Sequence, residues 1–447
     1  MSSYVLSRYN WNIRENDYNY IYNAISGCII KISDTMAEAI KNNTFNANMC
    51  NQKLLEILLK NHIIFPTESD EINYLKYKYL KNKYDDSFLS MVMLPSLKCN
   101  LRCHYCYEKF KDKTISKENI RILKTFFTKQ AQIRRYITLR WSGGEIMTAW
   151  EYINDISQHI QSECKKNHCG FTASAISNGT LLTPQIIEQM TNCQIKSIQI
   201  TLDGDKETHN LTRFYPNKLG TFDDIIKNIA IASKKLKVIV RVNIDKNNFD
   251  SMDSLFKTLS TNDINKSNLQ VSCKPVLCTL AQKPKNETFA HHEFYNIEQK
   301  LLELAEKYQI PYAFHMGINS VQTRCAYASL QGYYLTPDLN IFKCPAYVDI
   351  DSKGSRAIGR IMPNGDLKLT NINEYMNSFA YSPFDNKECM ECKALPICHG
   401  KCPVIWELNK RSQDEGCIPE KHTIEAKIRY AIRNQHQMNA YYNSGLI

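Results

Sequence analysis

Segments typical of strands and segments typical of helices alternate between residues 89 and 315, and this alternation limits the possible folds more than any other feature. Runs rich in β-branched residues are followed by longer runs with apolar residues at helical spacing. The candidate strands read FLSMVMLPS, YITLRWSG, TASAISNG, SIQITLDG, VIVRVNID and LQVSCKPV. Six strand–helix repeats predict an α/β fold with a parallel sheet and right-handed crossovers. Because no G-x-G-x-x-G follows the first strand, we expect a partial (β/α)6 barrel similar to a TIM barrel rather than a doubly wound nucleotide-binding fold.

The regions on either side of this core differ from it in composition. Residues 1–88 combine a β-rich start with helical spacing of apolar residues in NQKLLEILLKNHIIF, which predicts a small α+β module. Such a module could dock a peptide, in the manner of a winged helix, or serve as packing scaffold. Residues 316–425 are loop-rich and dense in cysteine, which is typical of a domain that relies on metal. Residues 426–447 are expected to add a C-terminal helix and tail.

Hydropathy and charge restrict the functional class. The 447 residues contain no apolar run near the roughly 18 residues of a membrane span, and the N-terminus lacks the apolar core of a signal peptide. We therefore expect a cytoplasmic protein without a membrane partner. The net charge of +11 could serve nucleic acid, an anionic cofactor or an acidic peptide. Because the basic residues are scattered and no nucleic-acid-binding signature is present, we interpret the charge as a solvated surface and expect no nucleic-acid partner.

Cysteine is the most informative residue type, with 17 copies in the chain. Cytosolic thiols stay reduced, so cysteines at tight spacings indicate metal rather than disulfides. In LKCNLRCHYCYE, Cys99, Cys103 and Cys106 follow the first predicted strand with the spacing C-x3-C-x2-C. A cubane [4Fe–4S] cluster has four irons, so three thiolates on one short loop leave one iron open for chemistry. A zinc site is the alternative, and it would need His104, whose ring would tend to point away from the centre of the three thiolates.

This motif resembles the signature of the radical S-adenosylmethionine (SAM) superfamily, C-x3-C-x-aromatic-C after a first strand. The resemblance implies that the open iron binds the amino and carboxylate groups of SAM. Reductive cleavage of SAM then yields a 5′-deoxyadenosyl radical, which abstracts a hydrogen atom. The resemblance also implies a flavodoxin- or ferredoxin-type reductant as a partner. Tyr105 occupies the aromatic position, which in the family lies against the adenine.

A glycine-rich motif follows at the end of the second predicted strand. Gly143, Gly144 and Glu145 resemble the family's GGE motif. Two glycines at a strand end let the backbone approach a ligand closely. The resemblance implies that Glu145 supplies negative charge to the SAM ammonium. The alternative interpretation is a tight turn that carries a surface glutamate.

Two more motifs follow in the family's order, at the ends of the third and fourth predicted strands. Ser177 and Asn178 resemble the segment whose side chains reach the ribose or carboxylate of SAM. Asp203 and Arg213 resemble the next stretch, in which Asp203 could accept ribose hydroxyls and Arg213 could hold a carboxylate or close the loop. For these polar residues, loop capping is the alternative role.

A second group of cysteines lies in the C-terminal part of the chain. Its members are Cys325, Cys344, Cys389, Cys392, Cys398, Cys402 and Cys417. The run ECMECKALPICHGKCP has the spacing C-x2-C-x5-C-x3-C and resembles the SPASM extension of radical SAM peptide maturases. The resemblance implies two auxiliary [4Fe–4S] clusters, the first held by Cys325, Cys344 and Cys402 and the second by Cys389, Cys392, Cys398 and Cys417. Taken without the first motif, the second group would suit zinc as well as iron–sulfur.

Seven thiolates are one fewer than two all-cysteine clusters need. The first auxiliary cluster therefore has an open iron or takes a ligand from elsewhere, for which Cys273 and Cys278 are candidates. An open auxiliary iron could bind a substrate group or accept an electron.

The SPASM resemblance implies an enzyme that modifies ribosomally made precursor peptides, and we expect an oxidative cross-link, either carbon–carbon or thioether. Formylglycine formation is less expected, because Pro345 stands where the sulfatase-maturing branch has an aspartate; Asp349 is the nearest acid. A peptide epimerase would need a thiol hydrogen donor, which Cys273 or Cys278 could supply. The remaining alternatives are a maturase of a folded protein and a non-enzymatic iron–sulfur or zinc scaffold. A scaffold has no need for an open iron, so the first cysteine group argues against it.

Overall fold

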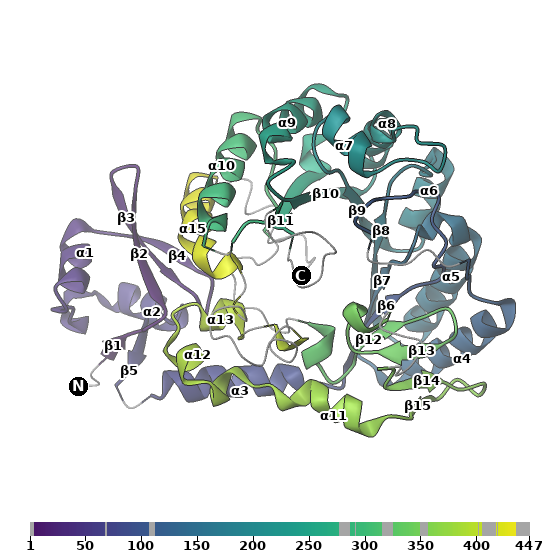
Figure 1. Cartoon of the computed structure of the whole chain (residues 1–447). Helices are drawn as coiled ribbons and strands as arrows, with labels where there is room; N and C mark the ends of the chain where they lie inside the picture. Colours follow the sequence, from purple (N-terminus) through teal and green to yellow (C-terminus); the bar gives the residue numbers. More distant parts are fainter. Residues whose placement is uncertain are drawn as a thin grey trace.

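The computed structural model describes residues 4–67, 69–106, 112–276, 287–290, 292–314, 325–348, 356–400, 402–404, 417 and 419–434. A curved sheet with helices along its outer side forms the body of the molecule, and the N-terminal module stands at one side of this body (Figure 1). Among these residues, no helix combines the length and the apolar composition needed to cross a membrane.

The body is the partial (β/α)6 barrel that the alternating pattern predicts. Its parallel strands are β6 (Phe88–Met93), β7 (Tyr136–Trp141), β8 (Gly170–Ser177), β9 (Ile195–Thr201), β10 (Lys237–Ile244) and β11 (Leu269–Pro275). Its helices are α4 (Lys117–Ile133), α5 (Trp150–Lys166), α6 (Pro184–Asn192), α7 (Lys206–Thr212), α8 (Phe222–Ser233), α9 (Met252–Thr261) and α10 (Phe294–Lys307). The strands lie in sequence order from β6 to β11, as expected when each helix crosses over to the next parallel strand. The predicted fold class is confirmed.

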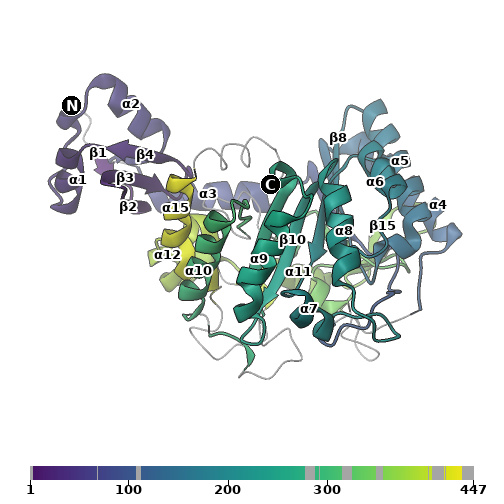
Figure 2. The same ribbon diagram turned by 90° about the horizontal axis from the view of Figure 1, so that it is seen from above.

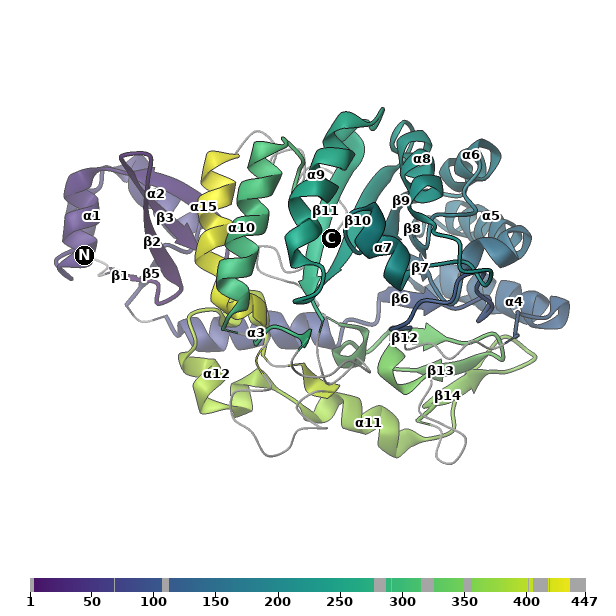
Figure 3. The ribbon, with the colours of Figure 1, turned by 45° about the horizontal axis from the view of Figure 1, so that its top comes forward.

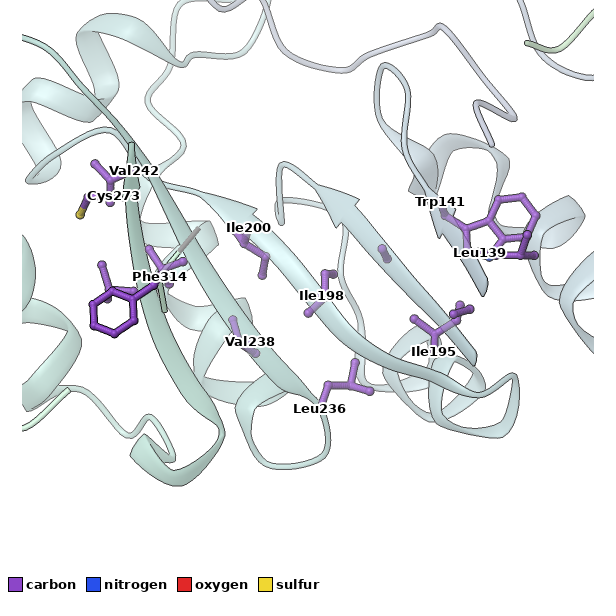
Figure 4. Packing of buried hydrophobic residues seen from close by; sticks show 14 of the residues in the cluster. Leu139, Trp141, Ile195, Ile198, Ile200, Leu236, Val238, Val242, Cys273 and Phe314 are labelled. Atoms are coloured by element: carbon purple, nitrogen blue, oxygen red, sulfur yellow. The ribbon is translucent and has the colours of Figure 1, made fainter. Parts of the chain in front are cut away.

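The sheet has a helix side, which α4–α10 cover, and an inner face, which is turned away from these helices (Figure 1). Successive side chains along each strand point to these two faces in turn. On β10, Val238, Val240 and Val242 are fully buried, whereas Ile239 and Arg241 on the other face are partly exposed. Figure 4 shows the buried residues of neighbouring strands packed together. Burying a side chain of this size contributes about 1.5–3 kcal/mol. The helix side of the sheet is therefore the main core of the molecule.

The barrel sheet continues into the C-terminal part of the chain. Strand β12 (Gly332–Leu335) pairs parallel to β6, and it is followed by the antiparallel strands β13 (Asn340–Phe342), β14 (Gly359–Ile361) and β15 (Leu367–Leu369). The sequence predicts loops here, because strands of three or four residues are too short to show periodicity. The later helices are α11 (Ile372–Ala380), α12 (Lys387–Glu391), α13 (Leu395–Cys398) and α15 (Ile424–Arg433).

Within its described residues, the N-terminal module contains two small sheets and three α-helices. Strands β2 (Asn10–Glu15), β3 (Tyr18–Asn23) and β4 (Ile29–Ile32) form an antiparallel sheet, and β1 (Tyr4–Leu6) pairs with β5 (Ile64–Pro66). The helices are α1 (Asp34–Lys41), α2 (Gln52–Lys60) and α3 (Glu71–Lys83). Each helix begins after a side chain that accepts a hydrogen bond from its first turn, namely Ser33, Asn51 and Asp70.

Helix α15 connects the N-terminal module to the barrel. It lies between the module and α10 (Figures 2 and 3). Arg429 and Arg433 of α15 form ion pairs of 2.8 and 2.9 Å with Glu15 of β2. Arg433 also pairs with Glu306 of α10 at 2.8 Å. The module is therefore tied to the end of the chain and to the barrel.

Candidate functional site

The loop after β6 carries the first group of cysteines. Cys99 and Cys103 are both partly buried, and burial raises the pKa of each thiol. The loop is held by the chain at the end of α7, because the backbone N–H of Arg102 donates to the carbonyl oxygen of Phe214 at 2.9 Å and that of His104 to the carbonyl oxygen of Thr212 at 3.1 Å. The ring of His104 packs edge-on against Phe214, with a centroid distance of 5.0 Å.

Gly143 and Gly144 hold the end of β7 against this cysteine loop. The N–H of Gly144 donates to the carbonyl oxygen of Ser96 at 3.1 Å, and that of Glu145 to Lys98 at 2.7 Å. A Cβ atom on either glycine would lie under 3.0 Å from a backbone carbonyl of the loop. Gly143 also has a φ of +133°, which L side chains rarely adopt. Two glycines at a strand end predict a close approach to a ligand; the structure shows a close approach to the loop that carries the cysteines.

Glu145 is fully buried at the junction of β7 and β8, so the interpretation as a surface glutamate is wrong. Its carboxylate accepts hydrogen bonds from the N–H of Met147 at 3.0 Å, the hydroxyl of Ser177 at 2.8 Å and the N–H of Asn178 at 2.7 Å. Burial raises the pKa of Glu145, while these three donors and Arg213 act to lower it. A carboxylate offers about four acceptor positions, so one remains for a further donor.

Ser177 and Asn178 connect the end of β8 to this network. The amide of Asn178 donates to Asn100 Oδ1 at 2.8 Å and lies 3.9 Å from the sulfur of Cys99. Asn100 in turn donates to the hydroxyl of Thr180 at 2.9 Å. The residue types alone did not single out Asn100, which lies inside the cysteine motif and carries no separate signal.

Tyr105, Asp203 and Arg213 form a buried polar group next to the cysteines. The hydroxyl of Tyr105 donates to Asp203 Oδ2 and accepts from Arg213 Nη1 at 2.8 Å. Burial lowers the pKa of Arg213, but Tyr105, Cys103 and Asp203 outweigh it, so the guanidinium stays charged. Its Nε is buried without a hydrogen-bond partner in the described part of the chain.

His209 holds this group in place from behind. Its Nδ1 accepts from the N–H of Asp203 at 3.2 Å, and its Nε2 lies 3.0 Å from the hydroxyl of Thr221. Burial lowers the pKa of His209 to about 3, so the ring is neutral. A neutral ring can accept on one nitrogen and donate on the other, as both contacts require.

Members of the second cysteine group lie in two places. Cys325 and Cys402 both act on the pKa of Cys344, and Cys344 and Cys402 share a small apolar cluster with Tyr327, so these three cysteines are neighbours. Cys389, Cys392 and Cys398 belong to α12, α13 and their junction, and pack on the main core. The sulfur of Cys417 lies 4.0 Å from Lys421 Nζ. Over the ranges described, no three cysteine, histidine or acidic side chains are arranged to hold a single metal ion.

Comparison with known proteins assigns a family to the barrel. Residues 93–259 match the radical SAM superfamily. These residues, which include most of the barrel, form a radical SAM domain. Among its relatives is the cysteine-type anaerobic sulfatase-maturating enzyme of Clostridium novyi (strain NT), which is 23% identical over 334 residues, 70% of this chain and 87% of that protein.

Solved structures of radical SAM enzymes have the same fold. Native anSMEcpe with bound AdoMet and Cp18Cys peptide superimposes with a TM-score of 0.56 and 19% identity, covering 80% of this chain and 99% of that chain. Streptococcus suis SuiB bound to precursor peptide SuiA gives a TM-score of 0.51 and 13% identity, covering 92% and 98%. At these identities the likeness establishes the fold and no more.

The chemistry of the described residues fits the cofactors of a radical SAM enzyme, a [4Fe–4S] cluster and SAM. We propose that Cys99, Cys103 and Cys106 hold the cluster. Glu145 has acceptor capacity left for an ammonium group, and Arg213 Nε is a buried donor suited to a carboxylate. The two form a complementary pair of charges for an amino acid end group such as that of SAM.

Three candidates for catalytic residues remain, and Cys273 is the one that the structure describes. It pairs with Val242, and both side chains lie on the helix side of the sheet (Figure 4). Burial raises its pKa to about 12, and its neighbours include Tyr312 and Glu298 rather than the second cysteine group. This position does not suit a hydrogen donor or a ligand on the inner face. Cys278 and Asp349 lie outside the described residues.

Proposed function

We propose that this radical SAM enzyme removes a hydrogen atom from a ribosomally made precursor peptide and installs an oxidative cross-link in it. When bound, SAM and its cluster supply the radical chemistry. The residues of the chain position that chemistry: Glu145 and Arg213 would orient SAM, and Asn178 would steady the loop at Cys99. A flavodoxin- or ferredoxin-type protein would supply the reducing electron.

The observation that carries this proposal is the position of Cys325, Cys344 and Cys402 beside the barrel. Strand β12 joins this region to β6, and Cys325 and Cys344 both act on the pKa of Tyr334, which lies on β12. A cross-link removes two hydrogens from the peptide, so the reaction needs an electron acceptor. An auxiliary cluster on these cysteines would place that acceptor next to the inner face.

The similar proteins support a peptide as the substrate. One solved relative holds a Cp18Cys peptide together with AdoMet, and another holds its precursor peptide SuiA. Among the residues that the structure describes, β4 pairs only with β3 and is an edge strand of its sheet. An edge strand can accept an extended peptide as an additional strand. We therefore assign binding of the leader segment to residues 1–88.

The test is co-expression with each short peptide encoded next to the gene, followed by mass spectrometry. A cross-link lowers the peptide mass by two hydrogens, whereas epimerisation leaves it unchanged. Conversion of serine to formylglycine also removes two hydrogens, but its aldehyde reacts with hydrazide reagents and a cross-link does not. SAM cleavage without any peptide product would contradict the proposal.

A further inference from the structure

Two cysteines that the proposed site does not use, Cys164 and Cys169, meet where helix α5 ends and strand β8 begins. The backbone N–H of Cys169 donates to the carbonyl oxygen of Cys164 at 2.9 Å, and that of His168 to the carbonyl oxygen of Lys165 at 3.5 Å. His168 has a φ of +56°, in the left-handed region. Together these features form a Schellman motif, which brings the residues at the two ends of its longer hydrogen bond together, often through an apolar contact. Here both residues are cysteines.

The geometry of this turn meets the distance requirement of a disulfide. The Cα atom of Cys169 is bonded to the donating nitrogen, and the Cα atom of Cys164 lies two bonds from the accepting oxygen. Standard bond lengths then limit the distance between the two Cα atoms to about 6.8 Å. Disulfides join cysteines whose Cα atoms are about 4.4–6.8 Å apart. The side chains also meet, because the thiol of Cys164 donates a hydrogen bond to the sulfur of Cys169.

Both thiols are buried, yet they lie just beneath the surface. Cys164 is 1% exposed and Cys169 is 7% exposed, whereas Lys165, Lys166 and His168 beside them are exposed. Local opening of such a turn costs less free energy than global unfolding, so a small reagent can reach Cys169. Burial raises the pKa of both thiols, that of Cys164 to about 12, and the hydrogen bond from Cys164 acts to lower the pKa of Cys169. Cys169 is therefore the thiol of this pair that ionises first.

We infer that Cys164 and Cys169 form a reversible dithiol–disulfide site that responds to the redox state of the surrounding thiols. The two cysteines are free in the structure, which is the form that a reducing compartment maintains. The oxidant is a low-molecular-weight disulfide of the glutathione class.

The reaction is a thiol–disulfide exchange in two steps. The thiolate of Cys169 attacks one sulfur of the small disulfide, so that a mixed disulfide forms and one small thiol leaves. Cys164 then loses its proton, attacks the sulfur of Cys169 and displaces the second small thiol. One S–S bond forms in the chain and one breaks in the small disulfide, which takes up two electrons and two protons from the protein and becomes two thiols.

The position of the pair indicates what the disulfide would do. Helix α5 and strand β8 connect Glu145 to Ser177 and Asn178, which hydrogen bonds join at one end of this unit. A disulfide between Cys164 and Cys169 would close the opposite end. It would stabilise the fold mainly by constraining the unfolded chain, and it would leave the residues proposed to bind SAM in place. This role is independent of the proposed peptide substrate.

The test uses the full-length enzyme with its clusters reconstituted, kept anaerobic and equilibrated with mixtures of reduced and oxidised glutathione. Free thiols are blocked in acid with N-ethylmaleimide, and the chain is digested with trypsin. Cleavage after the intervening lysines separates the two cysteines, so a disulfide appears in the mass spectrum as a linked pair of peptides. The variants are Cys164→Ala and Cys169→Ala. The matched control is Cys193→Ala, because Cys193 is equally buried but donates to Asn154 Oδ1 at 3.0 Å.

Wild type and Cys193→Ala should form the linked pair, with at least about ten times more of it than of the glutathione adducts of the same two cysteines. The second thiol is already in contact with the first, which gives it a high effective concentration. Oxidation should raise the thermal midpoint of both proteins by about 4–9 °C, as expected for closing so short a loop. Cys164→Ala and Cys169→Ala should show neither the linked pair nor this rise. The SAM affinity of the wild type should be the same before and after oxidation.

Two outcomes would overturn the inference. In the first, both cysteines stay free, or carry only glutathione, in mixtures that modify the partly exposed Cys28. In the second, formation of the linked pair lowers the midpoint, since a strained disulfide would show that the folded turn does not fit it. If an alanine variant fails to fold, the peptide map and the midpoint of the wild type still decide the question. Neither outcome bears on peptide modification, which has its own test.

Discussion

Replacement of Glu145 by glutamine tests the junction between the barrel and the cysteine loop, because it removes a charge and keeps the size of the side chain. One carboxylate oxygen accepts from Met147 and Ser177, and the other accepts from Asn178. Glutamine has one acceptor oxygen and one NH2 donor. In either orientation its NH2 group would therefore face the backbone N–H of Met147 or Asn178.

The size of the effect follows from this arrangement. A hydrogen bond to a charged group contributes about 1.5–3 kcal/mol. Burial raises the pKa of Glu145, which means that its charge is costly to bury. Removing the charge recovers part of this desolvation cost, so we expect the free energy of unfolding to fall by roughly 1–2 kcal/mol. For a unit of 150–250 residues this lowers the thermal midpoint by about 2–8 °C. If the remaining acceptor position binds the SAM ammonium, the SAM Kd should rise about 10- to 150-fold.

The assay is anaerobic equilibrium dialysis of SAM against the reconstituted enzyme, with release of 5′-deoxyadenosine followed in parallel. Glu151→Gln is the matched control, because Glu151 is an exposed glutamate in the first turn of α5. It should leave the SAM Kd unchanged and destabilise the fold by no more than the loss of one helix-end charge, about 0.3–1 kcal/mol. A lowered midpoint with an unchanged SAM Kd would falsify the binding role and leave Glu145 as a purely structural link between β7 and β8.

Three other changes have defined outcomes. Gly144→Ala places a Cβ against the carbonyl of Lys98 and should cost about four irons per chain in an iron assay, with the iron of the second cysteine group retained. The pKa of His209 is about 3 in the folded chain and ordinarily 6.5, so only the unfolded state gains a proton as the pH falls below 6.5. The free energy of unfolding should therefore decline by up to about 1.4 kcal/mol per pH unit towards pH 3. The thermal midpoint of His209→Asn should decline less than that of the wild type between pH 7.5 and 5. Glu298→Gln removes the carboxylate 3.5 Å from buried Lys427 and should destabilise the packing of α10 on α15 by about 3–5 kcal/mol, seen as a lower midpoint with unchanged SAM cleavage.

The barrel could be predicted because its signal is local and repeated. Segments such as VIVRVNI show the alternation of a strand, and each is followed by an amphipathic helix. The site could be predicted because parallel strands bring their C-terminal ends together. Cys99, Glu145 and Asn178 are far apart in sequence, yet each follows such a strand end, and the structure joins them through short contacts.

Features that depend on strand register or on backbone contacts could not be predicted in this way. Alternation puts Val271 and Cys273 on one face of β11, but only the pairing of Cys273 with Val242 shows that this is the helix side. The support of the cysteine loop comes from backbone carbonyls of Thr212 and Phe214, which carry no residue-specific signal. Likewise, Asn100 accepts a hydrogen bond from the side-chain amide of Asn178, and its residue type alone does not predict this contact.

The continuation of the sheet through β12 changes how the two cysteine groups relate to each other. As separate domains they could lie at any distance, and electron transfer between substrate and acceptor would depend on a mobile interface. Because β12 pairs with β6 in the register Tyr334–Val92, the region of Cys325 and Cys344 is held to the barrel by backbone hydrogen bonds. Val92 also pairs with Arg140, so the row Tyr334–Val92–Arg140 runs from the region of Cys325 and Cys344 to the end of β7, just before Gly143. Under the proposed function, a peptide bound along that row would lie near both cysteine groups without any movement between domains.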